Sequence, residues 1–263
     1  MFNYQFMRNA FLVGGLMAAI IPLIGTIVVF KRMSMVGDSI SHISLAGITM
    51  GLVLGYNPLL IAIVMSVLAA ILLEMISIRF SQYKELSLSI ILSLGVALTA
   101  LLSSFVKNPG SYNQYLFGSV INIVSSDIVV ALVLSLVIIL VSYVFYRDFF
   151  YIAFDETAAQ LAGIKVRSVS FLFTVLTAIT IAVASKVLGA LVISSLLVLP
   201  VASALQVARS YKQVMVYAIC YSLASMLIGL TASYYLNLVS GGTIVLTGII
   251  LLFITLVFKK KAL

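Results

Sequence analysis

Long runs of apolar residues, separated by short polar or charged stretches, make up nearly the whole chain. A helix needs about 20 mostly apolar residues to cross the hydrocarbon core of a bilayer, and most of these runs approach that length. The sequence predicts nine membrane-spanning helices, at residues 10–30, 34–54, 59–78, 86–106, 126–146, 168–185, 187–207, 213–236 and 241–258. Only Lys186 and Gly189 separate the sixth run from the seventh, so eight spans remain an alternative.

The composition supports the same fold class. Of the 263 residues, 63% are hydrophobic and 8% are charged, whereas a soluble domain carries about 25% charged residues. We therefore expect an all-α, polytopic protein of the cell membrane, surrounded by lipid, with residues 1–263 forming a single transmembrane domain. The net charge of +8 lies in short loops and at the C-terminus, so it indicates membrane topology and no nucleic-acid partner.

Basic residues predict the orientation, because they are concentrated in cytoplasmic loops. If the C-terminus is cytoplasmic and nine spans alternate, 12 of the 15 Lys and Arg residues fall inside and the N-terminus lies outside. The inner set is Lys31, Arg32, Arg79, Lys84, Arg147, Lys165, Arg167, Arg209, Lys212, Lys259, Lys260 and Lys261. Arg8, Lys107 and Lys186 fall outside.

The second span carries the candidate functional residues. Asp38 and His42, the only histidine, are four residues apart and so point the same way, one helical turn apart. Ser34, Ser41 and Thr49 are expected near the same face, and the glycines Gly47, Gly51 and Gly55 on the opposite face, where they suit close helix packing. A carboxylate and an imidazole within an apolar segment are costly unless they are paired or bound, which favours a functional site. A purely structural Asp–His pair is the alternative.

Two loops carry further candidates. The external loop 106–127 contains Tyr115, Phe117 and Gly118, either as interfacial anchors or as part of a short helix that gates a pathway. In the cytoplasmic loop, Asp155 and Glu156 precede an apolar stretch that ends at Gly163, which predicts a helix at 155–163. This helix is either a solvated surface helix or a docking element for a cytoplasmic subunit.

Five sequence blocks resemble the membrane permeases of ABC importers for metal ions, the zinc, manganese and iron group. They occur in the order of that family at residues 32–47 (RMSMVGDSISHISLAG), 115–120 (YLFGSV), 154–167 (FDETAAQLAGIKVR), 186–204 (KVLGALVISSLLVLPVASA) and 240–246 (SGGTIVL). The first block is most similar to the zinc-type permeases. The resemblance covers essentially the whole chain and implies a type II ABC importer-like permease fold.

The resemblance also implies partners and residue roles. The permease would form a homodimer, would bind a separate cytoplasmic ATPase, and would receive the ion from an external metal-binding lipoprotein. Asp38 and His42 would hold the metal ion in transit. The segment 154–164 would be the coupling helix, with Asp155, Glu156, Ala159 and Gly163 at the ATPase.

The chain itself is not expected to be an enzyme or to hold a permanent cofactor. It contains no G-x-x-x-x-G-K-[ST] loop for ATP and no H-E-x-x-H zinc-protease motif. A carboxylate and an imidazole suit a transported Zn²⁺, Mn²⁺ or Fe²⁺ ion. The similarity of the first block to the zinc-type permeases implies zinc first and manganese second. A secondary transporter driven by an ion gradient and a membrane subunit without transport are the alternatives. The small number of intramembrane acids argues against a secondary transporter, which would need them to carry protons. In a subunit without transport, the Asp38/His42 face would have no function.

Overall fold

The computed structural model describes residues 4–80, 83–106, 115–116, 118 and 125–260. Nine of the helices in these ranges are long and apolar enough to cross a membrane, so the prediction of nine spans is confirmed. They are α1 (Gln5–Phe30), α2 (Val36–Leu54), α3 (Pro58–Arg79), α4 (Lys84–Ser103), α6 (Ser125–Val144), α9 (Val166–Leu188), α10 (Ala190–Val207), α11 (Tyr211–Leu236) and α12 (Ser240–Lys260). The all-α fold class is likewise confirmed.

A single glycine separates α9 from α10. Gly189 has φ 92° and ψ 145°, a backbone conformation that residues with a Cβ rarely adopt. Lys186 lies within the last turn of α9 and is not part of the break. The narrow boundary expected from the sequence is therefore real, and one residue is enough to reverse the direction of the chain.

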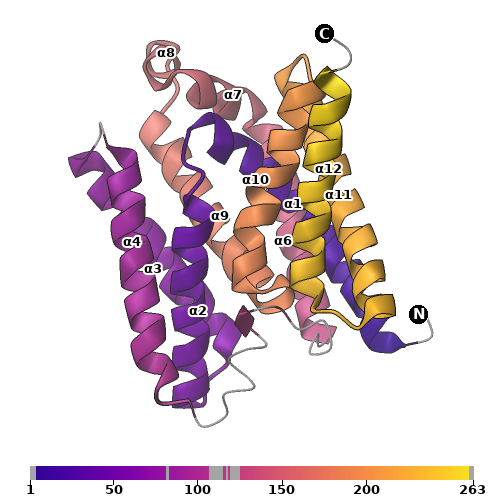
Figure 1. The fold of residues 1–263 in the computed structure, drawn as a ribbon. Coiled ribbons are helices and arrows are strands. Elements are labelled where there is room, and N and C mark those ends of the chain that lie inside the picture. The colour runs from indigo at the N-terminus through magenta and orange to yellow at the C-terminus, as the bar shows by residue number, and fades with distance from the viewer. Residues whose placement is uncertain (1–3, 81–82, 107–114, 117, 119–124, 261–263) are drawn as a thin grey trace.

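Helix α2 is the most buried of the described spans. It packs against α3, α4, α9 and α10, which surround it on several sides (Figure 1). Gly47 and Gly51 allow the approach of α3, because a Cβ at either position would lie 2.7 Å from the Cα of Ala62 or Pro58, respectively. The predicted packing role is confirmed for these two glycines.

The packing role is wrong for Gly55. It ends α2 in a left-handed conformation with φ 73°, and no described atom lies within 4 Å of the position of a Cβ. Gly55 is therefore used as a helix C-cap, a position that favours glycine because it has no Cβ.

The outer helices expose large apolar side chains, as expected where lipid replaces water. These side chains lie along α3, α4, α6 and α12, for example Leu68, Leu94, Leu136 and Phe253. The polar and half-exposed positions of α2 contrast with this apolar surface.

Helices α7 (Tyr146–Phe154) and α8 (Glu156–Leu161) lie at the end of the bundle where α12 finishes, opposite the start of α1 (Figure 1). We call this the α8 end. The sequence predicted a helix near α8 but not α7. Helix α7 buries Phe149, Ile152 and Ala153, and their spacing of three and one residues is the apolar pattern that could have revealed it.

The succession of spans also places the junctions α1–α2, α3–α4 and α10–α11 at the α8 end. The described members of the basic set, from Lys31 to Lys259, belong to these junctions, to α7, to the start of α9 or to the end of α12. They therefore gather at one end of the bundle. Which end faces the cytoplasm stays a prediction.

Candidate functional site

Asp38 and His42 occupy unusual positions on α2. Both side chains are half-exposed, whereas Gly37, Ser39 and Ile40 around them are buried. Asp38 is the third residue of the helix, and His42 follows one turn later, as the spacing predicted. A charged side chain and an imidazole thus reach an accessible face of a helix that is otherwise enclosed.

Two neighbouring helices fix this part of α2. On α4, the hydroxyl of Thr99 donates to the carbonyl oxygen of His42 at 3.1 Å. The hydroxyl of Ser39 donates to the carbonyl oxygen of Leu88, also on α4, at 2.9 Å. On the other side, a Cβ at Gly37 would lie 3.1 Å from the Cα of Ser194 in α10. Two hydrogen bonds with α4 and the close approach of Gly37 to α10 therefore hold the Asp38/His42 turn from two sides.

Two of the three hydroxyl groups predicted near the same face form hydrogen bonds within α2. The hydroxyl of Ser41 donates to the carbonyl oxygen of Asp38 at 3.0 Å, and that of Thr49 to Leu45 at 2.7 Å. Both residues are buried, whereas Ser34 is exposed before the helix begins. Asp38 and His42 are consequently the side chains of this face whose polar atoms are best placed to meet a ligand.

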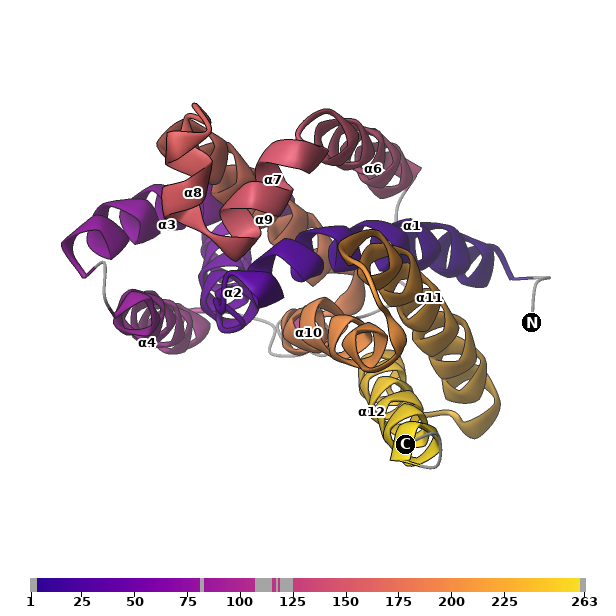
Figure 2. The same ribbon diagram turned by 90° about the horizontal axis from the view of Figure 1, so that it is seen from above.

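Within the described ranges, no three His, Cys, Asp or Glu side chains form a group that could hold a metal ion. Figure 2 shows α4 and α10 on either side of α2, with no described helix lying across α2 on the side away from α9. A site built on Asp38 and His42 would therefore need donor atoms from elsewhere, such as water or a second molecule.

The external segment is described only in part. Tyr115 packs against a small buried cluster formed by Ile48 of α2, Ala62 of α3 and Ala182 of α9. Burial and the charge of Asp127 raise the pKa of Tyr115 above its usual value, which keeps its hydroxyl protonated. Gly118 has φ 83°, and a Cβ there would lie 2.3 Å from the carbonyl oxygen of Leu188, so it is pressed against the α9–α10 turn.

These contacts place Tyr115 near α2 and Gly118 at the α9–α10 turn, both at the end opposite α8. Phe117 lies outside the described residues. The role of the segment as a gate stays a prediction.

Helix α8 has a capping motif at each end. The carboxylate of Asp155 accepts hydrogen bonds from the backbone N–H groups of Thr157 at 2.8 Å and Ala158 at 3.1 Å, as an N-cap does. At the other end, Gly163 has φ 81°, its N–H donates to Gln160, and the N–H of Ile164 donates to Ala159. This is a Schellman motif. The predicted helix and its glycine stop are confirmed.

The two faces of α8 differ. Ala159 is completely buried, whereas the side chain of Leu161 is 87% exposed. An isolated exposed leucine needs no explanation, but on a short, well-capped helix it offers an apolar anchor for a partner. Leu161 was not predicted as a candidate from the sequence. Its position two residues after Ala159 places it on the opposite face of the helix.

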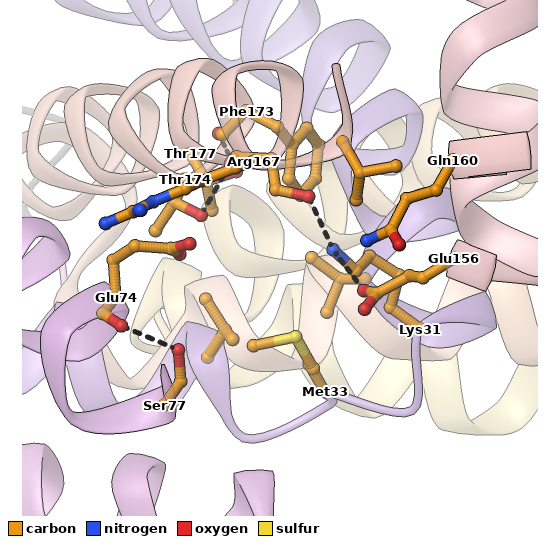
Figure 3. A pocket seen from close by; sticks show the side chains of 14 residues that line it. Lys31, Met33, Glu74, Ser77, Glu156, Gln160, Arg167, Phe173, Thr174 and Thr177 are labelled. Atoms are coloured by element: carbon orange, nitrogen blue, oxygen red, sulfur yellow. Dashed lines mark hydrogen bonds and ion pairs between the residues drawn. The ribbon is translucent and has the colours of Figure 1, made fainter. Parts of the chain in front are cut away.

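Lys31 is a second residue whose contacts were not predicted from the sequence, where it indicated only the membrane orientation. Its ammonium group lies 3.1 Å from the carboxylate of Glu156 on α8 and donates to the hydroxyl of Ser170 on α9 at 3.2 Å. The three residues lie at a cavity of about 220 Å³ near the α8 end, which Glu74 and Arg167 also line (Figure 3). No local pattern in the sequence could have paired Lys31 with residues so distant along the chain.

Comparison with known proteins identifies the family. A family model described as the ABC 3 transport family matches residues 3–259. The chain belongs to the ABC 3 transport family. The resemblance to ABC permeases inferred from the five sequence blocks is thereby confirmed.

Relatives of this permease cover nearly its whole length. A probable metal transport system membrane protein of Treponema pallidum is 34% identical, with 99% of this chain and 98% of the relative aligned. The manganese transport system membrane protein MntC of Listeria monocytogenes is 28% identical, over 98% and 92% of the two chains. The high-affinity zinc uptake system membrane protein ZnuB of Haemophilus influenzae is 29% identical, over 99% and 100%.

A solved structure has the same fold. The structure of PsaBC from Streptococcus pneumoniae in complex with Fab contains a chain that superposes with a TM-score of 0.84 at 25% identity. The match covers 96% of the permease and 91% of that chain. The permease fold expected from the sequence is thus confirmed.

Proposed function

We propose that this chain is the membrane-spanning subunit of an ATP-driven importer of divalent transition-metal ions. The observation that carries the proposal is the pair Asp38 and His42, half-exposed on the most buried of the described spans. Placing an ionisable side chain within a membrane span costs free energy, so such a residue indicates a function. Metal transport system proteins among the relatives support this reading.

The donor atoms suit the proposed cargo. A neutral imidazole and a carboxylate form a mixed nitrogen and oxygen set that fits Zn²⁺, Mn²⁺ or Fe²⁺ and is poor for Cu⁺. Zinc remains the first expectation and manganese the second, and named relatives of both kinds have similar identity. We expect a sparse shell of protein ligands, because a transport pathway has to release the ion.

A second copy of the chain would complete the site. Two Asp38 carboxylates and two His42 imidazoles across a two-fold axis would supply four ligands, which is the number preferred by tetrahedral zinc. Added water would give the octahedral geometry that suits manganese. The uncovered side of α2 between α4 and α10 supports placing this axis there.

The proposed partners follow from the two ends of the bundle. The basic residues at the α8 end favour a cytoplasmic location. A separate ATPase subunit would dock there on α8, with Leu161 as an apolar contact. The helix residues predicted at the ATPase are Asp155, Glu156, Ala159 and Gly163. A metal-binding lipoprotein would deliver the ion at the opposite end, near Tyr115 and Gly118.

The test uses the permease assembled with its ATPase in vesicles. Asp38→Asn keeps the shape and removes the charge, and His42→Gln removes the imidazole. We expect either change to abolish uptake of radioactive zinc or manganese while a melting curve stays close to that of the unchanged protein. Ser41→Ala is the control on the same turn, since its hydroxyl bonds only within α2 in the described structure, and it should transport nearly normally.

Two results would contradict the proposal. Full transport by a well-folded Asp38→Asn or His42→Gln variant would show that the pair does not hold the cargo. Uptake that continues without ATP and follows an imposed ion gradient would favour a secondary transporter. Competition between the two metals at equal concentration distinguishes a zinc permease from a manganese permease.

A further inference from the structure

Lys31 connects three helices at the α8 end. It is the C-cap of α1, and its side chain is only 10% exposed. The ammonium group bonds both the carboxylate of Glu156 at the first turn of α8 and the hydroxyl of Ser170 on α9. A lysine that exchanges its hydration for one carboxylate and one hydroxyl is fixed more strongly than a freely exposed surface lysine.

The connection from Lys31 to α2 is short and tightly folded. Arg32 adopts a left-handed conformation with φ 56°, and the N–H of Met33 donates back to the carbonyl of Val28 at 3.0 Å. The N–H of Val36 then donates to the carbonyl of Met33 at 2.9 Å, where α2 begins. Because these hydrogen bonds brace the turn at both ends, we expect a displacement of Lys31 to reach the start of α2. Asp38 is the third residue of that helix.

Other contacts leave room for α8 to move. Helix α8 packs on α7 and α9. Beside it, the cavity of about 220 Å³ extends to Met33, Val36 and Glu74, so the space between α8, the α1–α2 turn and α3 is not filled with side chains (Figure 3). Lys31 and its two partners, Glu156 and Ser170, line this cavity.

We propose that Lys31 is a positioning residue that makes α2 follow the movement of α8. Through its bonds to Glu156 and Ser170, it transmits a displacement of the coupling helix to the turn that carries Asp38. This proposal rests on the proposed function, since it presumes an ATPase that displaces α8. Lys31 does not contact the transported ion.

The test separates coupling from folding and from docking. Lys31→Met removes the ammonium group and retains much of the apolar stem. In vesicles containing the complete transporter, we expect ATP hydrolysis to persist and the number of ions transported per ATP to fall about two- to fivefold, as for loss of a part-exposed ion pair. Lys31→Arg should retain most of the coupling, because a guanidinium can still bond both oxygen atoms.

A charge exchange gives an independent measurement. Glu156→Lys alone should lower the number of ions per ATP, and the double variant Lys31→Glu with Glu156→Lys should recover part of the loss. Lys212→Met is the matched control, because it removes the same cation from an exposed position near the α8 end, at the start of α11.

The outcomes distinguish the two proposals. Unchanged ions per ATP in Lys31→Met would overturn the role of Lys31, as would loss of ATPase co-purification, which would show that Lys31 serves docking alone. An equal loss of coupling in Lys212→Met would also overturn it, because the effect would then be one of general charge. Failure of the unchanged protein to transport any divalent metal with ATP would instead contradict the proposed function.

Discussion

Gly95 of α4 allows this helix to contact the backbone of the Asp38/His42 turn, and Gly95→Ala tests that contact. A Cβ at position 95 would lie 2.8 Å from the backbone nitrogen of Ile43 and 3.0 Å from the carbonyl carbon of His42. The first distance is about 0.6 Å shorter than the ordinary contact of 3.4 Å. Because backbone atoms cannot rotate away, α4 and α2 must separate, and overpacking of this kind costs about 1–3 kcal/mol.

The substitution of glycine by alanine also stabilises the helix, and this effect must be subtracted from the measured change in stability. Alanine is better than glycine in a helix interior by about 1 kcal/mol, which hides part of the overpacking cost. Gly15→Ala in α1 is the matched control, since no described atom lies within 4 Å of the position of its Cβ. The difference between the two variants therefore reports the helix contact alone.

Thermal unfolding of the detergent-solubilised permease measures this difference. A loss of 1 kcal/mol lowers the Tm of a protein of this size by about 2–4 °C, so Gly95→Ala should melt about 2–12 °C below Gly15→Ala. Uptake should fall as well, because the displaced backbone carries His42. Equal melting temperatures for the two variants would refute the close contact between α4 and α2.

Two further predictions concern the α8 end. In a Cys220→Ala background, an impermeant thiol reagent on intact cells should label Tyr56→Cys, in the α2–α3 turn, but not Leu161→Cys on α8, since the basic residues predict that α8 is cytoplasmic; the opposite labelling would reverse the orientation. Gly163→Val should cost about 1–2 kcal/mol at φ 81°, and we expect weaker stimulation of ATP hydrolysis in the assembled transporter with little change in the melting of the spans; normal stimulation by a well-folded variant would argue against α8 as the docking helix.

Much of the architecture could be predicted from the sequence because it depends on local patterns. The length of each apolar run determines whether a helix can cross the membrane, and nine such helices are present in the described ranges. The spacing of Asp38 and His42 places them on one face, and the positions of Asp155 and Gly163 predict the two ends of α8. These features involve residues within a few positions of one another, so helix geometry is sufficient to derive them.

Only the tertiary structure decided which side chains are enclosed and which pairs meet. Helical periodicity could not show that Gly47 packs against α3 whereas Gly55 serves as a C-cap, or that Gly95 of α4 lies against His42. The bonds of Lys31 to Glu156 and Ser170 join segments more than a hundred residues apart along the chain. Such contacts depend on how whole helices pack. An apolar helix face is about as stable against lipid as against another helix, so close backbone packing and buried polar groups decide which arrangement forms.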